Sequence, residues 1–479
     1  MRNRIFYIVV SLLLTASLQG QTFSDFVLYL NDLPSQERQA KVDSFMNANE
    51  HLPLYENDTI CNFVYQGNAQ SVSVPGDATG WDPTVYTMSN IENTDFWYLT
   101  KVFASDTRLD YKFVLNGNNW ILDPKNPLTV LGGFGPNSEM AMPLYVQPPE
   151  IQYYPDIPHG TIFDTTFYSS QLGNSRQIKV YLPPYYETSP DKYPVVLFHD
   201  GLDYLNLAYA KNVLDYFLSS DCSRPVIAVF VPPVNREPEY AGSQINEFTG
   251  FIVDDIIPWV DGRFRTKTEP ANRLVLGASN GGNISLWIAM KHPEVFGKVA
   301  AYSSNVIDEI ATTFADGPIL NLDFYLDIGT YDIDVLIPMV HNFRDILDNR
   351  GYPFVFNEWN DGHSWGNWRA HIDNSLNYFF PPACGAGEIK EKAVIELKQN
   401  YPNPAGNSTT VSFYTPSVSE AELVLYDLKG SIIDILWEGK SSKGITKVNV
   451  NTAILQNGIY IYKLSAGNKT AVRKMIVRH

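Results

Sequence analysis

Ser279 lies in a short motif that could make a serine hydroxyl reactive. The run Gly277-Ala-Ser-Asn-Gly281 has the spacing Gly-x-Ser-x-Gly, in which the serine occupies a sharp turn between a strand and a helix. An apolar segment precedes it and the helix-like stretch 283–290 follows it, as this motif requires. A serine hydroxyl is a weak nucleophile until a base takes its proton, so the motif calls for a histidine elsewhere.

His363 is the candidate base. It lies in the glycine-flanked run Asn360-Asp-Gly-His-Ser-Trp-Gly366, directly after the strand-like segment Phe354–Phe356. Loops that leave the carboxyl ends of strands carry the functional residues of open α/β sheets. We therefore expect His363 to activate Ser279.

The acid that orients the histidine should lie between Ser279 and His363, because hydrolases with this motif run Ser, acid, His along the chain. The segment 325–334 offers Asp327, Asp332 and Asp334. Asp327 lies in a strand or at its end, whereas Asp332 follows it on the exit loop. We choose Asp332, with Asp334 as the alternative.

Two backbone N–H groups must stabilise the oxyanion that forms during attack on an ester. One should belong to Asn280, the residue after the nucleophile. The other should come from Gly201 or Leu202 in the run His-Asp-Gly-Leu after the apolar segment 195–199, although Asp-Gly is equally typical of a simple turn. Three further residues are candidate substrate contacts: His199, Arg236 and Trp365.

The elements that would position these residues are short apolar strands alternating with helical stretches between residues 161 and 383. The strands are almost continuously apolar, which is typical of a parallel sheet covered on both faces. The apolar residues from Phe248 to Val260 recur at helical spacing. The predicted fold class is therefore α/β. The strand-like segments lie at 178–182, 194–199, 226–231, 273–276, 322–326 and 354–356.

The regions on either side of residues 161–383 differ from them in composition and in the pattern of apolar residues. Residues 21–55 predict a helical lead-in, and residues 56–127 contain short strands between turns, which indicates a small β-sandwich. Residues 128–160 are rich in Gly and Pro and are expected to form a linker. A second linker is expected at 384–396, followed by strand-like segments in residues 397–479, which predict a second small β-sandwich.

Composition narrows the classes of function. A chain of 479 residues is long enough for several domains. Its net charge of −17 argues against nucleic acid as a partner. Cys61, Cys222 and Cys384 lie far apart, so buried free thiols are preferred, with one disulfide as the alternative. The eight histidines show no spacing typical of metal ligands, and we expect no metal or other cofactor.

The N-terminus has the pattern of a signal peptide. Arg2 and Arg4 precede an apolar run at 5–18, and small and polar residues follow, so residues 1–20 are expected to be removed on export. No later segment has eighteen consecutive apolar residues, and we expect no membrane span in the mature chain.

Residues 160–380 resemble the esterase family that includes feruloyl esterases, acetylxylan esterases of carbohydrate-esterase family 1 and enterochelin esterases. The resemblance implies that Ser279, Asp332 and His363 form a catalytic triad on an α/β-hydrolase fold. It rests on Val196-Leu-Phe-His-Asp-Gly201, Arg236–Tyr240, the Phe248–Pro258 helix, Gly277-Ala-Ser-Asn-Gly-Gly282, His292-Pro-Glu-Val-Phe-Gly297, Tyr302-Ser-Ser304 and Gly362-His-Ser-Trp-Gly-Asn-Trp-Arg369.

The predicted N-terminal sandwich resembles family-48 carbohydrate-binding modules, which have an early-set, immunoglobulin-like fold. The similar runs are Gly76-Asp-Ala-Thr-Gly-Trp81 and the segment 111–124. The resemblance implies that Trp81, Lys112 and Trp120 contact sugar. The alternative is that the domain packs on the hydrolase and that these tryptophans belong to the interface.

The C-terminal region resembles the sorting domain of type IX secretion in Bacteroidetes. The matching runs are Gln399-Asn-Tyr-Pro-Asn-Pro404, Tyr426-Asp-Leu-Lys-Gly430, Gly458–Lys463 and Lys474-Met-Ile-Val477. The resemblance implies the secretion machinery as a partner, and a secreted or surface-attached product.

Three functions follow from these observations. The first is a secreted serine esterase that removes feruloyl or acetyl groups from plant polysaccharide such as xylan. The second is a siderophore esterase of the enterochelin type, in which Arg236 and Arg369 would face an anionic ligand. The third is a surface glycan-binding protein without catalysis, which the presence of all three triad residue types disfavours.

Overall fold

The computed structural model describes residues 22–219, 224–381 and 396–479, with short gaps in the last range at 398–399, 401–402, 416–418, 428–430, 442–443 and 468. The predicted signal peptide, residues 1–20, lies outside the described residues, as do Cys222 and Cys384. Cys61 is a buried free thiol. The chain forms two compact units, Met1–Pro382 and Ala383–His479, and each is described by itself.

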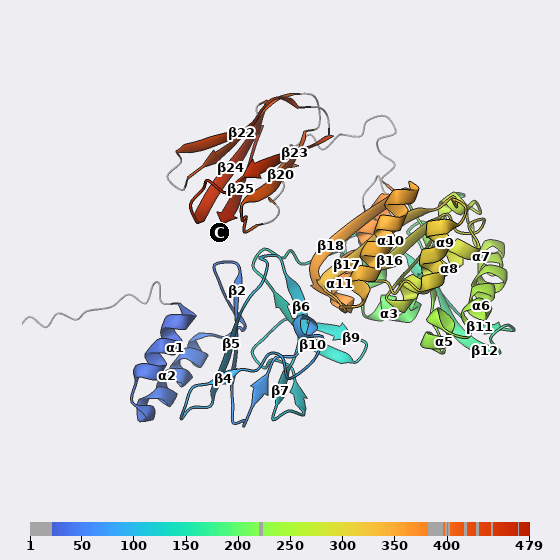
Figure 1. The fold of residues 1–479 in the computed structure, drawn as a ribbon. Helices are drawn as coiled ribbons and strands as arrows, with labels where there is room; N and C mark the ends of the chain where they lie inside the picture. Colours follow the sequence, from blue (N-terminus) through green and yellow to red (C-terminus); the bar gives the residue numbers. More distant parts are fainter. Residues whose placement is uncertain are drawn as a thin grey trace, which may run out of the picture. The chain divides into compact units, whose positions relative to one another are not determined.

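An eight-stranded sheet forms the centre of the α/β region of the larger unit, from residue 161 onward (Figure 1). Its strand order is β11-β12-β14-β13-β15-β16-β17-β18. The strands from β14 to β18 pair in parallel, whereas β11 and β12 form an antiparallel extension at one edge. This confirms the predicted α/β fold. The strands are β11 (Thr161–Ser169), β12 (Asn174–Leu182), β13 (Val195–His199), β14 (Ile227–Val231), β15 (Arg273–Ala278), β16 (Lys298–Tyr302), β17 (Asp323–Tyr331) and β18 (Phe354–Gly362).

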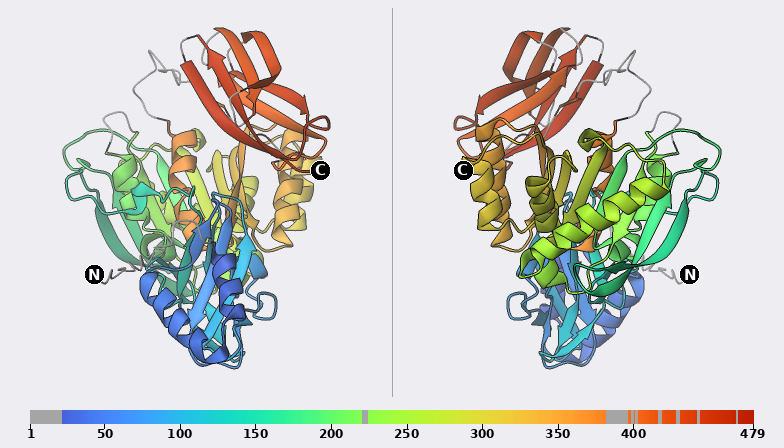
Figure 2. Two further views of the ribbon diagram at one scale, coloured as in Figure 1. Left: turned by 90° about the vertical axis from the view of Figure 1, so that its left-hand side faces the viewer. Right: turned by 90° about the vertical axis from the view of Figure 1, so that its right-hand side faces the viewer.

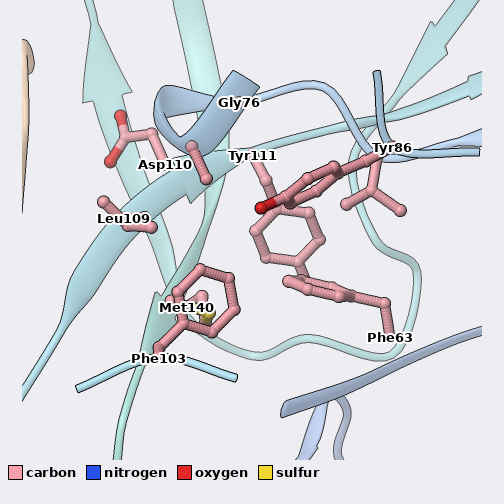
Figure 3. A pocket seen from close by; sticks show the side chains of 10 residues that line it. Phe63, Gly76, Tyr86, Phe103, Leu109, Asp110, Tyr111 and Met140 are labelled. Carbon is pink, nitrogen blue, oxygen red and sulfur yellow. The ribbon is translucent and has the colours of Figure 1, made fainter. Parts of the chain in front are cut away.

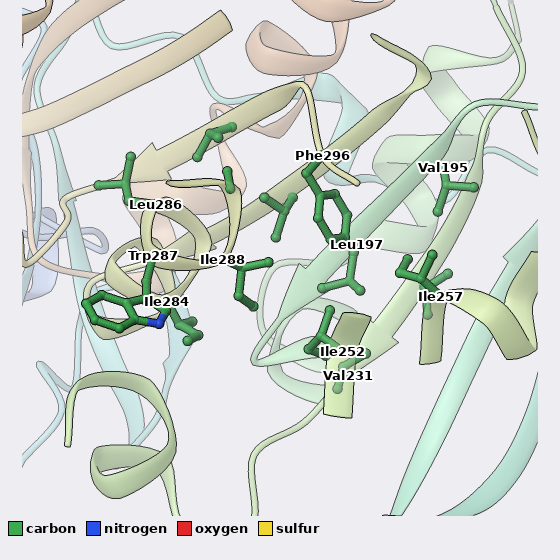
Figure 4. Packing of buried hydrophobic residues seen from close by; sticks show 14 of the residues in the cluster. Val195, Leu197, Val231, Ile252, Ile257, Ile284, Leu286, Trp287, Ile288 and Phe296 are labelled. Atoms are coloured by element: carbon green, nitrogen blue, oxygen red, sulfur yellow. The ribbon is translucent and has the colours of Figure 1, made fainter. Parts of the chain in front are cut away.

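Helices cover both faces of this sheet because successive strand residues point to opposite sides. In β13, Val195 and Leu197 pack into one apolar cluster, whereas Val196 and Phe198 pack into the other. Figure 4 shows part of the first cluster, and the right-hand view of Figure 2 shows the helices over that face. The helices of the first cluster are α6 (Ile245–Gly250), η3 (Phe251–Ile256), α7 (Ile257–Arg263), α8 (Asn280–Lys291), α9 (Asp308–Asp316) and α10 (Leu336–Arg350).

The second cluster is covered by shorter helices. They are α3 (Gly201–Asn206), α4 (Ala210–Phe217), α11 (Trp365–Arg369) and α12 (Ile372–Phe379). A further helix, α5 (Arg236–Ala241), follows β14 and contacts α6 and α8. Within the residues that the structure describes, none of the helices combines the length and the apolar character of a membrane-spanning segment.

The N-terminal part of the same unit begins with α1 (Phe23–Asp32) and α2 (Ser35–Ala48), which lie within residues 21–55. Three small sheets follow, with orders β1-β2-β5-β4, β3-β7-β8 and β6-β10-β9. We call residues 54–142 the N-terminal β domain. Its strands are β1 (Leu54–Glu56), β2 (Ile60–Gln66), β3 (Val72–Ser73), β4 (Ser89–Asn90), β5 (Phe96–Val102), β6 (Arg108–Tyr111), β7 (Phe113–Leu115), β8 (Asn119–Ile121), β9 (Thr129–Gly132) and β10 (Gly135–Ala141).

The structure corrects the expected linker at 128–160. Residues 129–141 form the hairpin β9–β10, and β10 pairs with β6 along Arg108–Tyr111. The glycines that suggested a linker form the hairpin turn, where Gly135 has a φ of +98°, a conformation that favours glycine. Only the segment after residue 142, with the short helix η2 (Pro149–Ile151), connects the β domain to β11.

The core of the N-terminal β domain is aromatic. A small pocket inside it is lined mainly by apolar side chains, among them Phe63, Phe103, Tyr111 and Met140 (Figure 3). Neither Ser279 nor His363 lines this pocket, so it belongs to the core of the β domain and is separate from the predicted catalytic residues.

The C-terminal unit consists of two small antiparallel sheets, β19-β20-β23 and β22-β21-β24-β25. Residues from both sheets share one apolar core, which confirms the predicted small β-sandwich. The strands are β19 (Glu396–Leu397), β20 (Ser408–Thr415), β21 (Ser419–Tyr426), β22 (Ile432–Ser441), β23 (Gly444–Asn451), β24 (Gly458–Ala466) and β25 (Lys469–Val477).

Candidate active site

Ser279 occupies a strained turn between β15 and α8. Its φ of +58° and ψ of −124° lie outside the ordinary regions for a residue with a side chain. The turn is closed by the Ser279 N–H, which donates to the carbonyl of Tyr302 at 2.9 Å. A Cβ atom at Gly277 would overlap the backbone of Gly281. The two glycines thus let the strand and the helix approach closely enough to form this turn.

His363 and Asp332 form a close pair at the same edge of the sheet as this turn. Asp332 follows β17 and His363 follows β18, and these strands are neighbours in the sheet. The His363 Nδ1 atom lies 2.7 Å from Asp332 Oδ1, which also accepts the N–H of Ile333 at 2.8 Å. The Asp332 side chain is fully buried, whereas that of His363 is 18% exposed. The ring is therefore oriented by a buried carboxylate while part of it reaches the surface.

The two alternative acids are placed differently. Asp327 lies within β17, accepts Trp359 Nε1 at 3.4 Å, and burial raises the pKa of its carboxyl well above the ordinary value. Asp334 is exposed. Of the three candidates, Asp332 is the one that is paired with His363.

Ser279 and His363 are linked through neighbouring residues. Both residues lie in the described part of the chain, and no hydrogen bond between their side chains is formed in this structure. The Trp368 ring packs edge-on against His363, with centroids 5.0 Å apart, and its Nε1 donates to Ser303 Oγ at 3.1 Å. Ser303 directly follows Tyr302, which holds the Ser279 turn. In unliganded enzymes the bond between nucleophile and base is often long and tightens with substrate.

Trp368 and Ser303 are residues whose part in the site the sequence reasoning missed. Both lie inside runs that carried the family resemblance, so their positions were visible. Their contact joins residues 65 positions apart, and no local pattern reports such a contact.

The expected oxyanion donors all lie in the first turn of a helix. Asn280 begins α8, and Gly201 and Leu202 begin α3. The first N–H groups of a helix have no carbonyl partner within it, so these donors are available to a negatively charged oxygen. A Cβ atom at Gly201 would overlap the backbone of Phe230 and Val231 in β14, which explains why glycine is needed there.

Arg236 links the two segments that carry the candidate oxyanion donors. Its guanidinium donates to both carboxylate oxygens of Asp200, at 2.8 and 2.9 Å, and to the carbonyl of Ala278 at 3.2 Å. Asp200 precedes α3 and Ala278 precedes Ser279. Arg236 was expected to contact substrate, but its charge is already paired inside the protein.

His199 does not line the site, contrary to expectation. It is fully buried against Tyr240 and Phe248, with ring centroids 5.4 and 5.6 Å apart. Burial, with a smaller effect of Arg236, lowers the pKa of His199 to about 3, so the ring stays neutral. Its place at the end of β13 suggested access to substrate, but these aromatic side chains cover it.

Trp365 is also mostly buried, at 9% exposure. It packs edge-on against Tyr204 and Trp368, with centroids 5.2 and 5.0 Å apart. This packing supports Trp368, which contacts His363, and leaves little of Trp365 free for a ligand.

The expected sugar-binding residues lie on the N-terminal β domain. The rings of Trp81 and Trp120 are nearly parallel, at 25°, with centroids 6.5 Å apart. Trp120 is 42% exposed, and Trp81 is half-buried, with its Nε1 donating to Asp77 Oδ1 at 3.1 Å. Lys112 is half-buried between β6 and β7. The structure therefore brings the two tryptophans together.

Within the described ranges of the chain, no group of three or more His, Cys, Asp or Glu residues could hold a metal ion.

Comparison with known proteins identifies relatives of the hydrolase region. Protein YjcH of Bacillus subtilis, whose function is uncharacterized, is 26% identical over 234 residues, covering 46% of this chain and 97% of its own length. An endo-1,4-beta-xylanase/feruloyl esterase of Xylanibacter ruminicola is 28% identical over 157 residues. That match covers 30% of this chain and only 22% of the relative.

Solved structures show the same fold. The enterobactin esterase FES from Shigella flexneri has a TM-score of 0.60 and 19% sequence identity, covering 70% of this chain and 97% of its own. The ferric enterobactin esterase from Salmonella typhimurium has a TM-score of 0.60 and 17% identity, covering 70% and 98%.

Family models match two parts of the chain. Residues 169–379 match the family described as "Putative esterase", and residues 399–478 match the secretion system C-terminal sorting domain. The sorting domain indicates a secreted or outer-surface protein that uses the secretion machinery. The chain thus has an α/β-hydrolase fold whose residues 169–379 match the "Putative esterase" family, together with an N-terminal β domain and a C-terminal sorting domain.

Proposed function

We propose that this protein is a secreted serine esterase that hydrolyses acyl esters of plant polysaccharide, such as feruloyl or acetyl groups on xylan. The observation that carries the proposal is the buried Asp332 carboxylate 2.7 Å from the His363 ring, at the same edge of the sheet as the strained turn at Ser279. Together they supply a nucleophile, a base and the acid that orients the base, within a domain of an esterase family.

In the proposed mechanism, Ser279 Oγ attacks the acyl carbonyl while His363 Nε2 accepts the hydroxyl proton. Asp332 stabilises the imidazolium that results. The negatively charged oxygen of the tetrahedral intermediate faces the N–H of Asn280 and that of Gly201 or Leu202. Removing one such donor typically slows an enzyme by about two to three powers of ten.

Collapse of this intermediate breaks the ester bond. The sugar hydroxyl leaves with the proton held by His363, and the acyl group stays on Ser279. A water molecule then loses a proton to His363 and attacks the acyl-enzyme. The carboxylic acid is released and Ser279 regains its proton, so each half of the cycle uses the same groups.

The surroundings of the triad favour a polymeric sugar ester. The protein is directed to the cell exterior, where polysaccharide is encountered. Flat indole rings can cover the apolar face of a sugar ring, and the Trp81 and Trp120 pair offers such a surface. A second binding surface on the same chain raises the local concentration of an insoluble substrate. One relative combines xylanase and feruloyl esterase in its name.

A siderophore ester is the second candidate, because the fold shared with the enterobactin esterases extends beyond the hydrolase domain. An anionic catechol ligand would require free positive charge. Arg236 is paired with Asp200, and Arg369 is buried with Glu139 at 3.2 Å. Because both arginines are already neutralised, we prefer the polysaccharide ester. The third hypothesis, glycan binding without catalysis, does not account for the ordered pair of His363 and Asp332.

A substrate panel tests this proposal. Purified full-length protein and its Ser279→Ala variant are incubated with methyl ferulate, acetylated xylan and enterobactin, and acid release is measured by chromatography. We expect release from methyl ferulate or acetylated xylan by the wild type only. Hydrolysis of enterobactin alone would show that the substrate is a siderophore ester and not a polysaccharide ester. Equal rates for the wild type and the variant would contradict a serine mechanism.

A further inference from the structure

A buried ionic network joins the N-terminal β domain to the loop that carries His363. Its centre is Arg108 of β6, which is fully buried. The guanidinium lies 2.5 Å from Asp110 and 2.8 Å from Glu139, both in the β domain. It also lies 3.4 Å from Asp361 and donates to Ser364 Oγ at 3.0 Å. One arginine of the β domain therefore binds residues on both sides of His363.

The backbone of the His363 loop is packed against the same network. A Cβ atom at Gly366 would overlap the Arg108 guanidinium, and one at Gly362 would overlap the carboxyl group of Asp77. Asp77 lies in the β domain and is buried. The positions of Gly362 and Gly366 are thus fixed by the β domain with no room for a methyl group, and the loop between them holds the catalytic candidate.

Further contacts extend this interface at the loop and at the acid. Asn360 donates to Asp106 at 2.7 Å, and Arg369 donates to Glu139 at 3.2 Å. At the end of the neighbouring strand β17, the Tyr331 ring packs against Phe103 with centroids 6.0 Å apart. Tyr331 directly precedes Asp332. The β domain therefore contacts both segments that carry the His363–Asp332 pair.

The charges in the network depend on Arg108. Burial alone would lower the pKa of this guanidinium, but the surrounding carboxylates, Asp110 first, raise it well above the ordinary value. Burial would likewise raise the pKa of Glu139, but Arg108 lowers it below its usual range. Burial raises the pKa of Asp361 to about 7 even though Arg108 opposes this. Without Arg108, these carboxyl groups would face one another without a buried cation beside Asp361.

We propose that Arg108 is a positioning residue for the catalytic histidine, and that the N-terminal β domain thereby completes the active site of the hydrolase domain. Arg108 does not touch substrate; it holds Asp361 and Ser364, which set the place of His363 relative to Asp332 and Ser279. The inference rests on the proposed serine esterase mechanism. It assigns the β domain a part in catalysis in addition to any sugar binding.

The test uses full-length Arg108→Ala and Gly366→Ala variants. The first removes the guanidinium. The second retains every charge but adds a methyl group where the guanidinium lies, so it decides the question if Arg108→Ala fails to fold. Folding is checked by circular dichroism and thermal unfolding. In folded variants we expect kcat for p-nitrophenyl acetate to fall by about 10- to 100-fold with little change in KM, since small displacements of a catalytic group have effects of this size.

Two further readouts separate positioning from general destabilisation. About 10 mM guanidinium ion, far below denaturing concentrations, should restore part of the kcat of Arg108→Ala by occupying the vacated site. The downfield proton resonance of the His363 Nδ1–H, identified by its loss in Asp332→Ala, should shift or broaden in both variants. This resonance reports the His363–Asp332 geometry even if the protein has no esterase activity.

Arg273→Ala is the matched control. Arg273 is also buried and ion-paired, with Asp261, but it lies at the opposite end of β15 from Ser279. It should lower the unfolding temperature while leaving kcat and the resonance unchanged. Wild-type kcat and an unchanged resonance in a folded Gly366→Ala variant would overturn the proposal, as would an equal loss of kcat in Arg273→Ala. An inactive wild type whose resonance still depends on Arg108 would reject the esterase function alone.

Discussion

The role of Asp332 is tested by comparing Asp332→Asn with Asp334→Asn. Asp332 Oδ1 accepts two hydrogen bonds, from His363 and from the Ile333 N–H. An asparagine at this position must therefore place its oxygen, not its NH₂ group, at the same point. The variant keeps the orientation of the imidazole ring, and what it loses is the negative charge.

The size of the effect follows from the geometry. With His363 Nδ1 and Asp332 Oδ1 2.7 Å apart, the centres of charge of an imidazolium and a carboxylate are about 4 Å apart. At an effective dielectric constant of about 20 their attraction is roughly 4 kcal/mol. This attraction develops as Ser279 loses its proton, and 1.4 kcal/mol corresponds to about a factor of ten in rate. We therefore expect kcat to fall by about three powers of ten.

Asp332→Asn should also lower the free energy of unfolding by about 1–3 kcal/mol, because the new NH₂ group replaces Asp332 Oδ2, which is buried and has no hydrogen-bond partner. Asp334 is exposed, and Asp334→Asn should leave kcat within about twofold, since surface substitutions rarely perturb a protein. Initial rates with p-nitrophenyl acetate, measured on variants shown to be folded, give both values. Asp332→Asn with more than a tenth of wild-type kcat, or an equal loss in Asp334→Asn, would refute this reasoning.

Three further predictions concern the surroundings of the proposed triad. His199→Leu should keep kcat within about twofold. The buried His199 ring binds a proton only near pH 3, whereas a histidine in the unfolded chain binds one near pH 6.5. As pH falls between these values, the free energy of unfolding of the wild type should therefore decrease by up to about 1.4 kcal/mol more per pH unit than that of the variant. Urea unfolding at two pH values checks this, and equal losses would contradict it. Trp120→Ala should weaken retention on insoluble xylan by about tenfold, because removal of a stacking aromatic costs roughly 1–3 kcal/mol. The variant should keep its kcat for p-nitrophenyl acetate. Unchanged retention on xylan would contradict a role of Trp120 in sugar binding. Arg236→Met should lower the free energy of unfolding by about 3 kcal/mol, because it leaves the buried Asp200 carboxylate unpaired. Urea unfolding should show a smaller loss for Arg236→Lys, which keeps the positive charge. Equal losses in the two variants would show that charge pairing is not the cause.

The central fold was predictable from the sequence because its signals are local. The strands of the sheet are short apolar runs buried on both faces, and the turn at Ser279 is marked by glycines at fixed spacing. The choice of Asp332 over Asp334 also followed from position, since a residue early on the exit loop of β17 lies nearest to the loop after β18.

Other features depended on contacts between distant segments. The glycines of the β9–β10 hairpin have the same composition as a linker, and only pairing with β6 distinguishes the two. His199 is covered by Tyr240 and Phe248, which follow it by 41 and 49 positions. The contact of Arg108 with Asp361 spans 253 positions. No local pattern reports such a contact, so the packing of the β domain against the segment around His363 became visible only in the folded chain.

The most direct test of the account is covalent labelling of the nucleophile. Folded wild-type protein is treated with a fluorophosphonate probe, digested, and the modified peptide is identified by mass spectrometry, with Ser279→Ala and heat-denatured wild type as controls. We predict one modified residue, Ser279, and no labelling of either control. A folded wild type that stays unlabelled, or is labelled at another serine, would contradict the assignment of Ser279, Asp332 and His363 as the catalytic triad.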